Sequence, residues 1–159
     1  MAVRVLFVCL GNICRSPTAE GVFRALIREA GLEDEYVVDS AGTGSWHIGQ
    51  SPDARAAAAC SRHGIDISAH RARQVRAEDF ENFDWILACD EENLADLNRM
   101  KPAASRARTA LLMPFAGNPA DRVVPDPYYG GAADFESTVH RAQHACRGLL
   151  AALQKARGV

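Results

Sequence analysis

The sequence predicts a single α/β domain in which helices cover both faces of a parallel sheet. Apolar, β-branched segments alternate along the chain with amphipathic helical patterns. Parallel neighbours need crossover connections, usually helices, so this alternation favours a parallel sheet. The length of 159 residues suits one domain, and 48% hydrophobic residues are enough for a buried core. We therefore expect one domain over residues 1–159 with a doubly wound sheet of four strands.

The first half of the chain is expected to supply two strands and two helices. Residues 3–8 form an apolar run that reads as a buried strand and ends at a cysteine. A helix is expected over 17–30, with Ser16 in the N-cap position. A second strand over 36–40 leads through a short loop to a second helix over 51–64.

The second half is expected to complete the sheet. A third strand over 84–89 precedes a helix that Asp90 can cap, and a short fourth strand follows over 110–113. Residues 114–127 are the only long irregular stretch, and long loops in compact domains are usually functional. Apolar residues spaced mostly three or four apart then mark a long final helix over 135–153.

The loop over 9–15 has the composition of an oxyanion site. Gly11 and Asn12 both tolerate positive φ, and the next helix starts immediately afterwards. Such a loop directs backbone N–H groups at one point beside the positive end of a helix dipole, which favours phosphate. Cys9 would be held there as a thiolate nucleophile, and Arg15 can clamp two phosphate oxygens. The alternative is that Cys9 is an unreactive thiol buried in the core.

The stretch Cys9-Leu10-Gly11-Asn12-Ile13-Cys14-Arg15-Ser16-Pro17 resembles the phosphate-binding loop of the low-molecular-weight protein tyrosine phosphatases. Chain length and the N-terminal position of the motif agree with that family. The resemblance implies a flavodoxin-like fold of the phosphotyrosine phosphatase I-like type. It also implies hydrolysis of phosphotyrosine monoesters through a phosphocysteine on Cys9, with Arg15 stabilising the phosphoryl group.

Asp126 is the candidate general acid, because expulsion of a phenolate needs a proton donor near the bridging oxygen. Prolines on both sides restrict its backbone, although such a segment is by itself a simple turn. The surrounding Pro125-Asp126-Pro127-Tyr128-Tyr129-Gly130 resembles the acid loop of the same family. Tyr128, Tyr129 and Trp46 are expected to form aromatic walls for the substrate ring, the alternative being that they pack into loops.

Several further roles are implied by the resemblance. Ser16 would hydrogen-bond the Cys9 thiolate in addition to capping the helix. Asn12, Ser40 and His70 would hold the loop in its left-handed shape, although His70 alone reads as an ordinary surface histidine. Cys14 lies close enough in the loop to form a reversible disulfide with Cys9.

No metal or cofactor is expected. His140 and His144 have the i, i+4 spacing of a metal pair, but no third ligand lies near them in the sequence. Cys9 and Cys14 lack the second pair that a structural zinc site needs. The arginines at 71, 73 and 76 read as a solvated face.

Composition limits the partners and the compartment. A net charge of −2 gives no nucleic-acid footprint, and no apolar run approaches the ~18 residues of a membrane span. No signal peptide is recognisable, and five cysteines without a regular framework suggest a reducing, cytoplasmic setting. Phosphotyrosine proteins, including a bacterial tyrosine kinase, are the partners that the resemblance implies, with phosphate and other oxyanions as inhibitors.

Three alternatives stay open. A thiol-linked arsenate reductase uses the same loop but needs two more cysteines, and the position seven after Cys89 is Asp96. Phosphoarginine phosphatases tend to carry threonine where this loop has Ile13. A non-catalytic phosphotyrosine-binding module would not need Cys9, Arg15 and Asp126 together.

Overall fold

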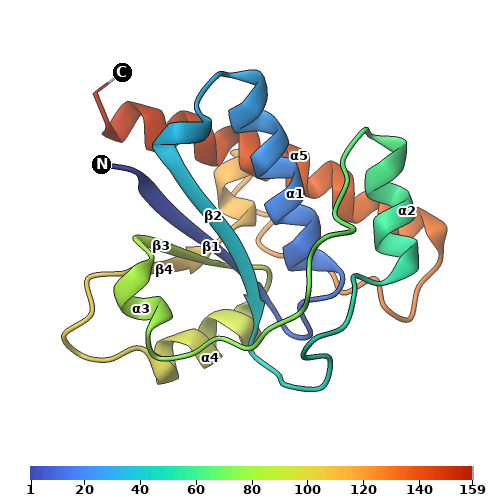
Figure 1. Cartoon of the computed structure of the whole chain (residues 1–159), viewed down its shortest axis with the longest axis horizontal. Coiled ribbons are helices and arrows are strands. Elements are labelled where there is room, and N and C mark those ends of the chain that lie inside the picture. The colour runs from blue at the N-terminus through green and yellow to red at the C-terminus, as the bar shows by residue number, and fades with distance from the viewer. Residues whose placement is uncertain (159) are drawn as a thin grey trace.

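A computed structural model describes residues 1–158 as a four-stranded, all-parallel sheet with helices on both faces (Figure 1). The strand order is β2-β1-β3-β4, so the chain switches direction across the sheet after β2. This architecture confirms the predicted doubly wound α/β fold. The strands are β1 Val3–Cys9, β2 Tyr36–Gly42, β3 Trp85–Ala88 and β4 Arg108–Leu111.

Two groups of helices cover the sheet. The larger group packs on one face and consists of α1 (Arg15–Glu29), α2 (Ala54–Arg62) and α5 (Ala132–Ala156). The short α3 (Asp79–Asn82) and α4 (Glu91–Met100) lie on the other face. Two 3-10 turns, η1 (Glu33–Glu35) and η2 (Met113–Ala116), complete the elements.

The central strand β1 explains why the core has two halves. Val5 and Phe7 point into the cluster under α1 and α5, whereas Leu6 and Val8 point into the cluster under α3 and α4. All four side chains are fully buried. Because successive side chains of a strand face opposite sides, a strand covered on both faces must be apolar throughout. The strand ends at Cys9, which belongs to the cluster under α1 and α5.

Some predicted boundaries need correction. β2 runs two residues further than predicted, to Gly42, and β4 spans 108–111 rather than 110–113. The first helix already begins at Arg15, with Cys14 in the N-cap position, so the prediction of Ser16 as the N-cap was wrong. The short elements α3, η1 and η2 were not predicted, since a single turn leaves no periodic pattern. Within residues 1–158, none of the helices has the length and apolarity that crossing a membrane requires.

The carboxyl ends of β1 and β3 lie side by side at the switch point of the sheet. Open α/β sheets bind ligands there, beyond the strand ends. Residues 9–15 leave β1 at this edge, and Asp90 follows β3. The fold therefore brings two loops that are far apart in sequence to one place.

Candidate active site

The loop over residues 9–15 turns its carbonyl groups outward. The carbonyls of Cys9 and Leu10 accept from the N–H groups of Thr43 and Gly44, each at 2.9 Å. The Asn12 carbonyl accepts from Nε2 of His70 at 3.0 Å, and the Ile13 carbonyl accepts from Asp53 N–H at 2.9 Å. The Cys14 carbonyl accepts from both Oγ1 (2.7 Å) and N–H (3.3 Å) of Thr18. In a trans peptide the following N–H points opposite to the carbonyl, and the described chain has no cis bonds. The loop's N–H groups therefore face its interior, where an oxyanion can accept from several of them.

Asn12 holds the loop in this shape. It is fully buried and has φ of 59°, which makes it the one non-glycine residue with positive φ in the described chain. Its Nδ2 donates to Ser16 Oγ (2.8 Å) and Ser40 Oγ (3.0 Å), and its Oδ1 accepts from Arg73 N–H (2.9 Å). These bonds tie α1, β2 and the 70–74 segment to a single side chain.

The partners of Asn12 are themselves anchored. Ser40 donates to Glu20 Oε1 (2.6 Å), which lies 3.6 Å from Nδ1 of His70. His70 is nearly buried rather than an ordinary surface histidine. Arg73 forms a two-bond pair with the buried Asp79 carboxylate (3.0 and 3.1 Å), so reading this arginine as part of a solvated face was wrong.

Cys9 lies at the floor of the loop, and the residue is 2% exposed. Ser16 Oγ is 2.9 Å from Sγ, and the Asn12 N–H donates to Sγ at 3.3 Å. A hydroxyl and an amide therefore both stabilise negative charge on this sulfur. Ser16 lies in the first turn of α1, which begins two residues earlier than expected, and is therefore not the N-cap of this helix.

Arg15 is held rigidly beside the sulfur and is 4% exposed. Its Nη1 donates to Asp90 Oδ2 (2.6 Å) and to the Val124 carbonyl (3.1 Å). Burial by itself lowers the pKa of Arg15, but nearby sulfur groups and the Asp90 carboxylate outweigh burial and raise that pKa above its ordinary value. The guanidinium is therefore a fixed positive charge at the edge of the loop.

Asp126 enters from the irregular segment before α5. Its Oδ2 lies 3.8 Å from Arg15 Nη2, and its Oδ1 accepts from Tyr128 N–H at 3.1 Å. The side chain is 46% exposed, so it can exchange protons with water. A carboxyl group at this position stands beside the anion loop without blocking it.

One pocket of about 400 Å³ joins these groups. Its apolar wall comprises Trp46, Tyr128 and Tyr129, and its floor contains Cys9 and Arg15. The rings of Tyr128 and Tyr129 meet edge to face at 5.0 Å. The predicted nucleophile, anion clamp, acid and aromatic walls therefore lie around a single cavity.

The sequence did not predict the site contacts of four residues, Asp90, Glu20, Arg73 and His47. Asp90 had been noted only as the cap of α4, which it is: its Oδ1 accepts from Asn93 N–H at 2.8 Å. Its position after β3, beside β1, could have revealed the contact with Arg15. Glu20 and Arg73 carry no motif, and His47 lines the pocket from the loop after β2.

Comparisons with known proteins show the family to which the chain is similar. The family model described as "Low molecular weight phosphotyrosine protein phosphatase" matches residues 4–158. A phosphatase of that name from Sus scrofa is 45% identical over 147 residues, 92% of each chain. The structure of a protein tyrosine phosphatase from Entamoeba histolytica, with Hepes in its active site, has a TM-score of 0.93 at 36% identity and covers 98% of this chain and 99% of its own. The structure of a Drosophila arginine phosphatase has a TM-score of 0.89 at 35% identity and covers 94% of this chain and 96% of its own.

Proposed function

This chain belongs to the low molecular weight phosphotyrosine protein phosphatase family and is a cysteine-dependent protein tyrosine phosphatase, in which we propose that Cys9 is the nucleophile and Asp126 the general acid. The observation that carries the assignment is the meeting of Cys9, Arg15 and Asp126 at one pocket. Phosphoproteins that carry phosphotyrosine are its substrates. An autophosphorylating tyrosine kinase is the partner class that we favour among them.

In the first step, Cys9 Sγ forms a bond to phosphorus while the bond to the tyrosyl oxygen breaks. Asp126 gives its proton to that oxygen, so the leaving group departs as a neutral phenol. The loop N–H groups and Arg15 stabilise the charge on the three equatorial oxygens. Phosphate and similar oxyanions bind the same groups and act as inhibitors.

In the second step, Asp126 acts as a base. Its carboxylate takes a proton from the water that attacks phosphorus, and the sulfur leaves as a thiolate. Ser16, 2.9 Å from Sγ, stabilises the departing thiolate. Asn12, Ser40 and His70 are positioning residues, because they reach the reaction only through the shape of the loop.

Cys14 protects Cys9 from irreversible oxidation by forming a disulfide with it, which an external thiol can reduce. Peroxide converts the Cys9 thiolate to a sulfenic acid, and attack by the Cys14 sulfur then forms a disulfide and releases water. Both sulfurs are free thiols that line the same pocket. All five cysteines are free and buried, which is consistent with the cytoplasmic, reducing setting that we propose.

Two alternatives can be compared with this proposal. The likeness to a Drosophila arginine phosphatase makes phosphoarginine the second candidate substrate. A thiol relay to reduce arsenate is disfavoured, because Asp96 stands where the second relay cysteine is needed. Steady-state kcat/KM on phosphotyrosine, phosphoarginine and phosphoserine peptides separates these activities.

Variants of the two proposed catalytic groups test the mechanism. Cys9→Ser is expected to abolish turnover of p-nitrophenyl phosphate while retaining vanadate binding. Asp126→Asn should lower kcat on phosphotyrosine by roughly 10²–10⁴. Asp121→Asn is the matched control, since this residue lies in the same loop but pairs with Arg141 outside the pocket. Full activity in Cys9→Ser, or equal kcat in Asp126→Asn and Asp121→Asn, would contradict the proposal.

A further inference from the structure

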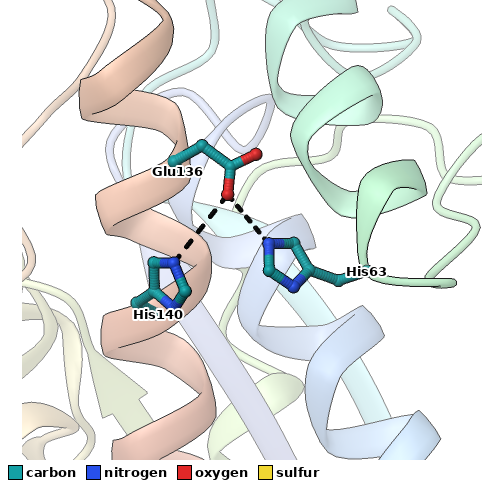
Figure 2. Close-up of side chains that lie close together, drawn as sticks. All are labelled: His63, Glu136 and His140. Atoms are coloured by element: carbon teal, nitrogen blue, oxygen red, sulfur yellow. Dashed lines mark hydrogen bonds and ion pairs between the residues drawn. The ribbon is translucent and has the colours of Figure 1, made fainter.

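A second cluster of ionisable side chains lies between α2 and α5, outside the pocket that contains Cys9. His63 follows the last residue of α2, and Glu136 and His140 stand one turn apart on α5 (Figure 2). Glu136 Oε2 is 2.8 Å from Nε2 of His63 and 3.9 Å from Nε2 of His140. One donor atom from each residue lies within 4.8 Å of the other two.

The Glu136 carboxylate is already oriented toward the two imidazoles. Arg62 Nε donates to its Oε1 at 2.6 Å, which leaves Oε2 facing His63 and His140 (Figure 2). The orientation of the carboxylate is therefore fixed by a neighbour that is not itself a ligand.

We propose that His63, Glu136 and His140 bind a divalent zinc ion. Two imidazole nitrogens and one carboxylate oxygen are a ligand set that Zn²⁺ prefers, with a fourth position left for water. Ligand distances of about 2.0–2.2 Å require the three donor atoms to close around the ion. Rotation of the two rings achieves this, because His140 is 59% exposed and His63 is 24% exposed. The same exposure gives the ion a path from solvent.

The ligands come from both helices, so the ion tethers α2 to α5. The spacing of His140 and His144 on α5 had suggested a metal pair without a third ligand; the structure instead joins His140 to Glu136 on its own helix and to His63 from α2. Zinc binding replaces the hydrogen bond between His63 and Glu136. Because the ion binds the folded chain, it is expected to raise the melting temperature.

Isothermal titration with Zn²⁺ at neutral pH tests the site. A Cys9→Ser background removes the catalytic thiolate, which is itself a zinc ligand. We expect one ion per chain, with a Kd that rises roughly tenfold or more when His140→Gln is added. His144→Gln is the matched control: it lies one turn further along α5 and should leave the Kd unchanged.

Two spectroscopic readouts keep the result independent of folding and of activity. Co²⁺ in place of Zn²⁺ should give visible absorption bands that disappear in His140→Gln, and the ring proton signals of His63 and His140 should shift on zinc addition. Equal affinity in His140→Gln and His144→Gln, or no binding in the Cys9→Ser protein, would overturn the proposal. Zinc that binds without shifting these histidine signals would overturn it too.

Discussion

Replacement of Asn12 tests how the phosphate loop is held. Three hydrogen bonds of 2.8–3.0 Å end on its side chain, which is fully buried. At about 0.5–1.5 kcal/mol each, their loss should lower the free energy of unfolding by roughly 1.5–4.5 kcal/mol. Its φ of 59° adds a second cost for alanine, about 1–2 kcal/mol, that glycine does not have.

Comparison of Asn12→Gly with Asn12→Ala separates the two contributions. Both variants lose the hydrogen bonds, but only alanine must adopt the left-handed conformation with a Cβ atom. We expect Asn12→Ala to be less stable than Asn12→Gly by about 1 kcal/mol, and both to have a lower kcat because the loop N–H groups lose their fixed directions.

Urea denaturation and steady-state kinetics provide the measurements. Asn118→Ala serves as the control, because this exposed residue makes only a local bond to Ala120 N–H and should cost little. If Asn12→Ala unfolds within about 1 kcal/mol of the wild type, the three hydrogen bonds do not stabilise the loop. If the glycine and alanine variants are equally stable, the backbone argument fails.

Three further predictions concern Arg15 and Cys14. Asp90→Ala removes the carboxylate that accepts a 2.6 Å hydrogen bond from Arg15. KM for p-nitrophenyl phosphate and Ki for phosphate should then each rise about tenfold, which corresponds to ~1.4 kcal/mol of binding free energy. Unchanged values would show that Arg15 does not need Asp90 to hold it in place. Burial is the main cause that raises the pKa of Cys14 from 9.0 to about 12, so the folded protein keeps a proton that the unfolded chain releases. The free energy of unfolding should therefore not depend on Cys14 below pH 9.0, and it should fall between pH 9.0 and pH 12 by up to about 1.4 kcal/mol per pH unit. Urea denaturation at a series of pH values should find a smaller slope in Cys14→Ala. After peroxide treatment, dithiothreitol should restore activity in the wild type and much less in Cys14→Ser, whereas equal recovery would exclude the disulfide.

The sequence was informative where the chemistry is local. Residues 9–15 are consecutive, so their order alone indicates a strand, a loop with left-handed backbone and a helix start. The long helix α5 was predictable for a similar reason, since its apolar residues repeat over many turns. Boundaries at strand ends were less accurate, because the ends of β2 and β4 are set by pairing with neighbours that the sequence does not identify.

The contacts around the loop could not be read in this way. Asp90 reaches Arg15 across 75 positions, and Arg73 reaches Asn12 across 61. Single polar residues of this kind belong to no repeat or motif in the sequence. Each of them could equally be a solvent-exposed surface residue. The zinc site that we propose has the same character, with His63 and Glu136 separated by 73 positions.

The sequence by itself determined the α/β class and the order of the strands and longer helices, and it predicted an anion loop over residues 9–15, because these follow from hydrophobic periodicity and from neighbours along the backbone. Only the tertiary structure decided which groups orient Arg15 and which histidine meets His140. Those choices depend on the order of β2-β1-β3-β4 and on the packing of α2 against α5. Packing brings residues together by position in space, and no local pattern records that position.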